Sequence, residues 1–157
     1  MKGMIKRMAA VGAAMLLALA AGCGQQTVEL DPTEALDQLK TEISFTDQMT
    51  DMDSAGACRF YDVDTDWVAD AAAYIGSGAT AESMAVFEAA DTDAAGSIAE
   101  ALRTFTDSWI AGYSDYKPEE VPKLENAVLE QSESYVVFCV AADYDAAETA
   151  VHDLLNP

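Results

Sequence analysis

Apolar residues recur at helical spacing near the start, in the middle and at the end of the chain. Leu36, Leu39 and Ile43 lie three and four residues apart, which places them on one face of a helix. The same spacing recurs further on, in Ile98, Leu102, Phe105 and Trp109. A shorter predicted helix ends near Tyr61. The pattern predicts helices over residues 32–43, 54–61, 93–112 and 145–155.

Four other segments have the composition of β-strands, and their ranges are 68–76, 83–89, 126–131 and 135–141. The loop 77–82 contains the small residues of a hairpin. Residues 69–73 are rich in alanine and could instead be helical, but Tyr74, Ile75 and Gly76 favour a strand. The unbroken apolar run 135–140 is typical of a central strand that is covered on both faces or lies under helices.

A short repeat also marks the chain: residues 89–95 read AADTDAA and residues 141–147 read AADYDAA. Each copy follows a predicted strand and opens a predicted helix, where aspartates cap free N–H groups. The repeat indicates either two ββα units or a coincidence of capping in an alanine-rich chain. Both readings give an α+β domain with a four-stranded, mostly antiparallel sheet, helices on one face and an additional N-terminal helix.

The start of the chain has the three parts of an export signal. A basic segment with Lys2, Lys6 and Arg7 precedes an apolar run over 8–21, which is too short to span a bilayer. Small residues then end in Cys23, and this ending resembles the lipobox of bacterial lipoproteins, although that family favours leucine where Ala20 stands. The resemblance implies cleavage before Cys23 and lipidation of its thiol. The alternative is an ordinary signal peptide that leaves Cys23 unmodified.

This interpretation divides the chain into a signal peptide (1–22), a lipidated tether (23–31) and a single domain (32–157). It predicts a protein anchored by lipid to the extracytoplasmic face of the cell membrane. The formal net charge is −20 at pH 7, and the basic residues of the signal would leave with it. Such a surface repels nucleic acids. It indicates solubility in a crowded envelope or, alternatively, capture of cations or a basic partner.

Catalytic and metal-binding patterns are nearly absent from the sequence. The spacing of Asp62, Asp64 and Asp66 resembles the start of an EF-hand loop, but Trp67 and Ala73 occupy the positions of the required glycine and glutamate. A different calcium site built on these aspartates stays open. Residues 76–80 are rich in glycine but lack the lysine of a phosphate-binding loop.

The chain has one histidine, His152, which we expect on the surface, and no Gly-x-Ser-x-Gly motif. Cys58 and Cys139 could form a disulfide in an exported protein, although Cys139 lies in an apolar run typical of a buried residue. We therefore expect no enzyme, no cofactor and no metal.

Several segments resemble a family of small lipoproteins of unknown function found in Gram-positive anaerobes. The similarity extends from about residue 42 to 155, and the matching segments are 45–49, 60–63, 76–82, 84–88 and 116–124. The resemblance implies a surface-anchored domain of Gram-positive type and brings no active site with it.

Together these observations predict a non-enzymatic envelope module that binds a protein or ligand and contacts the membrane through its lipid. The expected contact surface is the helix-free face of the sheet with the hairpin tip, comprising Tyr74, Gly76, Ser77, Gly78 and Thr80. The alternative is a cation- or solute-binding accessory lipoprotein for a transporter.

Overall fold

The computed structural model describes residues 29–157, so the predicted signal and Cys23 lie outside the described residues. The helices are α1 (Pro32–Glu42), α2 (Ser54–Tyr61), α3 (Thr92–Tyr116), α4 (Val121–Glu125) and α5 (Tyr144–Leu155). The strands are β1 (Met49–Met52), β2 (Val68–Gly76), β3 (Ser83–Ala89), β4 (Val128–Ser132) and β5 (Tyr135–Val140). All neighbouring strands are antiparallel, in the order β1-β2-β3-β5-β4.

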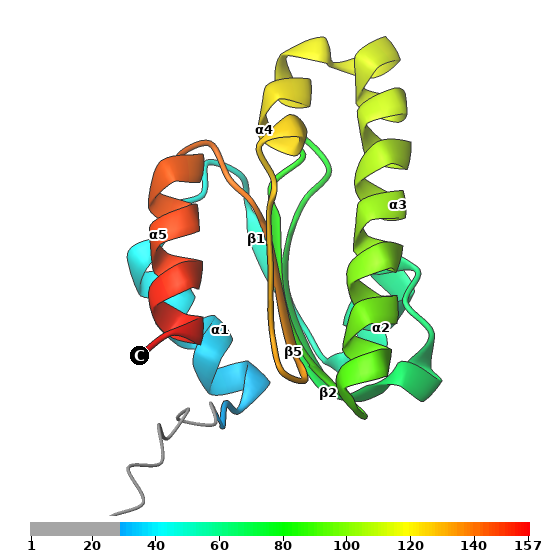
Figure 1. Ribbon diagram of the computed structural model, residues 1–157. Coiled ribbons are helices and arrows are strands. Elements are labelled where there is room, and N and C mark those ends of the chain that lie inside the picture. Colours follow the sequence, from blue (N-terminus) through cyan, green and yellow to red (C-terminus); the bar gives the residue numbers. More distant parts are fainter. Residues whose placement is uncertain (1–28) are drawn as a thin grey trace, which may run out of the picture.

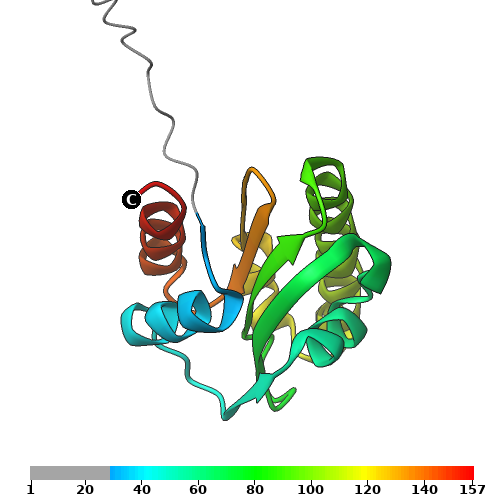
Figure 2. The same ribbon diagram turned by 90° about the horizontal axis from the view of Figure 1, so that it is seen from below.

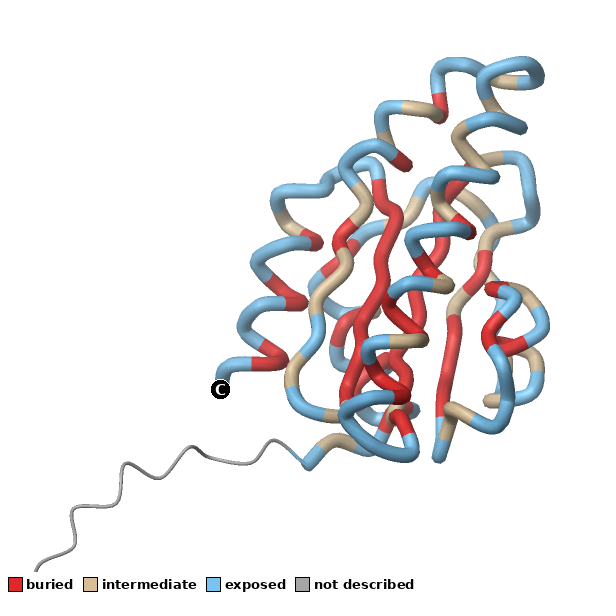
Figure 3. Tube along the Cα trace, turned by 45° about the vertical axis from the view of Figure 1, so that its right-hand side comes forward, coloured by how far each residue is buried: buried red, intermediate tan, exposed pale blue. Residues whose placement is uncertain are grey.

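Helices cover both faces of this sheet, which corrects the expectation of helices on one face. Figure 1 shows α1 and α5 on one side and α2 and α3 on the other, and Figure 2 shows the same three layers end-on. The reason is that neighbouring residues of the central strands are buried alike. Phe138 belongs to the core under α2 and α3, while Val137 belongs to the core under α1 and α5. All positions of β5 are accordingly buried, and long runs of buried positions follow the central strands (Figure 3).

The fifth strand, β1, is the strand that the sequence pattern missed. It is four residues long and pairs only with β2, from Met49 opposite Gly76 to Met52 opposite Ala73. The α+β class and the mostly antiparallel sheet are confirmed, and so is the strand over residues 69–73. Residues 113–123 lie between the predicted helix 93–112 and the predicted strand 126–131; they complete α3 and form a 3-10 turn (Pro118–Glu120) and most of α4.

The repeated AAD segments do cap helices. Asp91 accepts a hydrogen bond from the Ala94 amide at 2.7 Å, and Asp143 accepts one from the Ala146 amide at 3.1 Å. The order strand–strand–helix also occurs twice. However, α3 and α5 lie on opposite faces of the sheet (Figure 2), so the two segments are not equivalent in space. Shared capping chemistry accounts for their similarity.

The chain enters the domain at a fixed point. The Leu30 amide donates a hydrogen bond to the Tyr135 hydroxyl at 3.1 Å, next to the start of α1. Asp31 then caps α1, accepting from the amides of Thr33 and Glu34. Residues 30 and 31 are therefore tied to the start of β5 and to α1. Among the described residues, no helix has the length and hydrophobicity to cross a membrane.

Cys58 and Cys139 are free thiols that lie on opposite sides of the sheet. Cys58 belongs to the core under α3, and Cys139 to the core under α5. The sheet separates them, so the disulfide left open by the sequence is absent from the fold. Burial raises the pKa of Cys58 and raises that of Cys139 to about 12, so neither thiol ionises at neutral pH.

Gly112 lies inside α3 rather than at its end. A side chain added there would meet no atom within 4 Å, and the position is exposed. We expect Gly112→Ala to raise the free energy of unfolding by ~0.5–1 kcal/mol, because alanine restricts the unfolded chain and favours the helix. Urea denaturation measures this, and a destabilised variant would contradict the helix assignment.

Tyr61 and Ser83 bury hydroxyl groups that have no hydrogen-bond partner in the described structure. Burial raises the pKa of Tyr61, so its hydroxyl stays neutral. We expect the double variant Tyr61→Phe/Ser83→Ala to change the free energy of unfolding by less than ~1 kcal/mol, since removing both orphaned groups leaves no new unpaired partner. Urea denaturation of the double variant tests this, and a free energy of unfolding lower by more than ~2 kcal/mol would show that the hydroxyls have hydrogen-bond partners.

Candidate functional site

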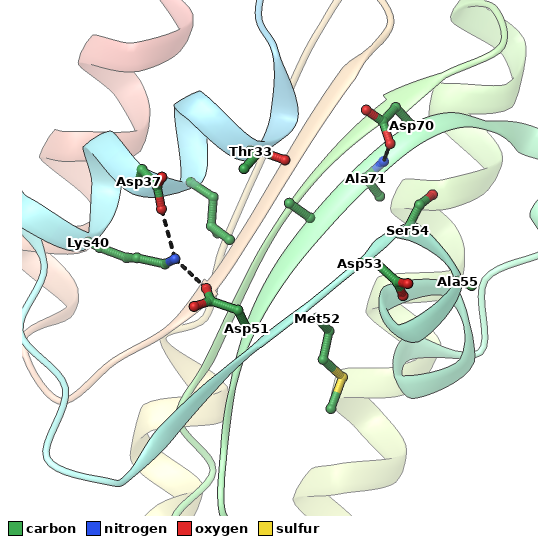
Figure 4. Close-up of a pocket in the computed structure, with 12 residues that line it drawn as sticks. Thr33, Asp37, Lys40, Asp51, Met52, Asp53, Ser54, Ala55, Asp70 and Ala71 are labelled. Carbon is green, nitrogen blue, oxygen red and sulfur yellow. Dashed lines mark hydrogen bonds and ion pairs between the residues drawn. The ribbon is translucent and has the colours of Figure 1, made fainter.

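A groove of about 670 Å³ opens at the edge of the sheet where β1 ends. Its walls are α1 and the start of α2, and its floor is the part of β2 that β1 does not cover (Figure 4). Because β1 reaches only to Ala73 on β2, residues 68–72 have no neighbouring strand on this side. The groove therefore contains an unpaired stretch of sheet edge between two helices, in which Asp70 is exposed and Ala71 and Ala72 are buried beneath the lining side chains.

Among the charged side chains of this groove, acidic ones predominate. Asp37, Asp51, Asp53 and Asp70 line it, with Lys40 as the single basic residue. Lys40 donates a hydrogen bond to Asp37 at 2.8 Å and another to Asp51, as the dashed lines in Figure 4 show. Burial lowers the pKa of Lys40, but these two bonds outweigh it and raise the pKa overall. The lysine charge is thus shared by two carboxylates, and the groove keeps an excess of negative charge.

The remaining two carboxylates are held by the backbone. Asp53 caps α2 by accepting a hydrogen bond from the Gly56 amide at 2.8 Å. Asp70 accepts a hydrogen bond from the Ala71 amide at 2.8 Å. Neither carboxylate forms an ion pair within residues 29–157. Both negative charges are fixed in position and open to a cationic ligand.

The predicted contact surface is only partly assembled. Gly76, Ser77 and Thr80 gather around Asp47, which accepts hydrogen bonds from the Ser77 hydroxyl at 2.6 Å and the Thr80 hydroxyl at 3.1 Å. The Ser77 hydroxyl is the largest cause of the lowered pKa of Asp47. Asp47 itself was missed, because no sequence motif joins residue 47 to residues 76–80; the one signal was that both segments belong to the family resemblance.

Tyr74 and Gly78 lie outside this cluster. Lys40 sits 4.7 Å above the centre of the Tyr74 ring, and Phe45 packs edge-on against it at 5.8 Å. Gly78 is exposed at the tip with φ 90°, a conformation that favours glycine. The helix-free sheet face that was expected to join these residues does not exist, because α1 covers the Tyr74 side.

A buried ionic cluster lies beneath the hairpin tip. Lys123 of α4 donates hydrogen bonds to Glu82 at 3.1 Å and contacts Glu120 at 3.0 Å, and both glutamates are almost fully buried. Glu82 also accepts from the amides of Thr46 and Asp47, at 2.7 and 3.0 Å. Glu120 accepts from the Ala81 amide at 3.0 Å. With every carboxylate partnered, the cluster fastens the hairpin to α4 and leaves no free acid or base.

The cluster predicts a specific acid response. Burial alone would raise the pKa of Glu82, but its hydrogen bonds to Asp47, Thr46 and Lys123 lower it overall. A carboxylate whose pKa is lower in the folded state stabilises the fold at pH values above its unfolded-state pKa. This stability is lost as the pH falls through the folded-state pKa. We expect the free energy of unfolding to fall more steeply between about pH 5 and about pH 3 in the wild type than in Glu82→Gln. Urea denaturation across that range tests this; equal slopes would contradict it.

Gly76 is required by the packing around Asp47. A Cβ at this position would lie 2.8 Å from the Asp47 carboxylate and 2.8 Å from the backbone oxygen of Glu82. Because the backbone cannot yield easily, we expect Gly76→Ala to lower the free energy of unfolding by ~1–3 kcal/mol. Gly112→Ala, with open space, serves as the control measured by the same denaturation. A Gly76→Ala variant as stable as that control would contradict the tight contact.

The other acidic and histidine candidates have local roles. Asp62 ends α2 in the left-handed conformation, at φ 55°, and Asp64 caps the 3-10 turn by accepting from the Asp66 amide. His152 is exposed, as expected, 3.6 Å from Glu130. Within the described residues, no group of three or more histidine, cysteine, aspartate or glutamate side chains is arranged to hold a metal ion.

Comparison with known proteins gives one match. A family model described as "Domain of unknown function (DUF4358)" matches residues 41–141, which is well over half of the chain. No curated protein and no solved structure matches. The matched range includes the whole sheet, the Asp47 cluster and the buried ionic cluster. Nearly all of α1, which forms one wall of the groove, lies before it.

Proposed function

We propose that this chain, which belongs to the DUF4358 family, is a non-enzymatic binding module held outside the cell by a lipid on Cys23. The observation that carries the binding role is the acidic groove at the open end of the sheet edge. Its fixed carboxylates, Asp53 and Asp70, have no cationic partner in the described structure. A protein partner with a basic segment fits such a groove by charge complementarity.

The absence of a reactive group among the described residues supports binding over catalysis. The two thiols are buried and protonated, and His152 has no serine or cysteine beside it. The carboxylates of the buried ionic cluster are all engaged by N–H or hydroxyl donors. A general acid or base must instead be free to reach a substrate.

Crosslinking in intact cells followed by affinity capture tests the proposal. The full-length wild type is compared with the variant Asp37→Asn/Asp53→Asn/Asp70→Asn, whose asparagines keep the capping geometry and remove the charge. Asp107→Asn/Asp115→Asn/Asp153→Asn is the matched control, because it removes three exposed charges elsewhere. We expect one dominant crosslinked partner that the groove variant loses at least tenfold and the control retains. Equal capture by all three proteins would overturn the role of the groove.

The anchor is tested separately with Cys23→Ala. We expect the wild type to sediment with membranes and to be released by detergent, and the variant to appear in the soluble extracellular fraction. We also expect metabolic labelling with an alkyne fatty acid to mark the wild type and not the variant, and a wild type without label would overturn lipid anchoring, whatever the result of the capture experiment.

A second candidate function is solute binding for a transporter, and an aromatic cleft favours it. This cleft, of about 600 Å³, lies between α2 and α3 and is lined by Phe60, Trp67 and Trp109 beside Asp62 and Asp64. Aromatic faces with nearby carboxylates are the features that bind organic cations. Saturable quenching of tryptophan fluorescence by tetramethylammonium, lost in Trp67→Ala, would support this function. Absence of quenching would contradict solute binding in this cleft and leave the acidic groove as the candidate site.

A further inference from the structure

The groove of Figure 4 is shaped by an interrupted strand rather than by a loop. β1 occupies the position beside β2 as far as Met52, and the chain then turns into α2 at Ser54. The space that a longer β1 would fill is a groove lined by Asp70, Ala71 and Ala72 of β2. At about 3.3 Å per residue, an extended segment of about three residues pairs with this stretch.

The backbone at this edge has hydrogen-bonding groups to offer. The Gly76 amide donates to the Glu82 oxygen across the hairpin at 3.1 Å, so it faces β3. Backbone groups alternate in direction along a strand, which turns the Ala71 amide toward the open side. The Ala71 amide donates a hydrogen bond to the side chain of Asp70 at 2.8 Å. The register of β2 also shifts between Val68 and Asp70, and such irregularities and charges are the devices that protect a free sheet edge.

From this geometry we infer that the groove binds an extended basic segment of a partner protein by strand addition to β2. The inference rests on the proposed function and specifies its partner chemistry. A carbonyl oxygen of the added strand would accept a hydrogen bond from the Ala71 amide in place of the Asp70 carboxylate. The freed carboxylate would then form an ion pair with a lysine or arginine of the added strand. Side chains of the added strand would point alternately toward Asp37 on α1 and Asp53 on α2.

Charge decides which occupant the edge takes. A second copy of this chain would bring the same carboxylates against the groove, in a protein whose formal net charge is −20. Like charges brought together in this way oppose association. A segment rich in lysine or arginine carries the opposite charge and gains both the backbone bonds and the ionic contacts.

The test uses a fluorescein-labelled hexapeptide of lysine and threonine, capped at both ends, and measures its binding by fluorescence anisotropy. A second peptide carries N-methyl groups on its two central residues. Adjacent amides point to opposite edges of a strand, so this peptide cannot pair by either edge and keeps all its charges. We expect the N-methylated peptide to bind at least tenfold more weakly.

Hydrogen exchange followed by NMR locates the contact. We expect the unmethylated peptide to slow exchange of the Ala71 amide at least tenfold and to leave the Ala72 amide unchanged, since that amide faces β3. Equal binding of the two peptides without protection of Ala71 would overturn strand addition. If the triple asparagine variant lost that binding, the acidic groove of the proposed function would stand.

Two further outcomes also overturn the inference. No binding of the unmethylated peptide would exclude a basic strand, and the capture experiment would still decide the proposed function independently. A dimer in sedimentation that the peptide cannot dissociate would show that a second copy occupies the edge.

Discussion

Replacement of Lys123 by methionine is expected to lower the free energy of unfolding by about 3–5 kcal/mol, because it leaves the buried Glu82 without a cation and Glu120 with only the ammonium group of Lys117, 3.7 Å away. Lys123 is the ammonium group shared by Glu82 and Glu120, whose side chains are 0% and 6% exposed. Burial lowers the pKa of Lys123, but the bonds to Glu120 and Glu82 outweigh it and raise the pKa overall, so the lysine is charged at neutral pH. Chemical denaturation at pH 7 measures the loss.

Lys40→Met is the matched control for this change. Lys40 also bridges two carboxylates, but Asp37 and Asp51 are 65% and 69% exposed. Water replaces the lost cation at an exposed pair, so we expect a loss below ~1 kcal/mol. If the two variants were equally stable, the cluster around Lys123 would have to be open to water. That result would contradict its burial.

The second large effect concerns the two cores of the sheet. We expect Phe138→Ala to destabilise the domain by ~3–5 kcal/mol and Met84→Ala by ~2–5 kcal/mol, since each leaves a cavity in a packed interior. Phe138 packs under α3 against Tyr61, with ring centres 5.5 Å apart, and Met84 lies on the opposite face under α1 and α5.

The pair of variants therefore tests the three-layer arrangement itself. A sheet with one solvated face would tolerate one of the two substitutions with little loss. Urea denaturation of both variants, with Gln131→Ala at an exposed position of β4 as the control, distinguishes these cases. Tolerance of either core substitution would contradict helices on both faces.

Much of the secondary structure follows from sequence periodicity, whereas its arrangement depends on distant contacts. The bounds of α2, β2 and β3 agree with the predicted 54–61, 68–76 and 83–89, because turns and caps mark their ends. The choice of face for α5 was not predictable in this way. Its apolar stripe fits either side of a sheet whose central strand β5 is apolar at every position.

The candidate site was harder to predict than the fold. The groove exists because β1 is short. An edge strand of four residues, 49–52, shows only a weak alternation of apolar and polar positions. Its charges come from α1, β1, α2 and β2, and none of them forms a sequence motif. The Asp47 cluster likewise joins residues that are distant in the chain, although residues 45–49 and 76–82 both stood out in the family resemblance.

The bond between the Leu30 amide and the Tyr135 hydroxyl limits the reach of the domain. With a lipid on Cys23, the chain from Cys23 to Leu30 would span seven residues, which is at most about 25 Å when fully extended. The groove wall at Thr33 follows three residues later. A partner would therefore have to present its basic segment close to the bilayer surface. A target held further out in the cell wall would lie beyond the reach of this short tether.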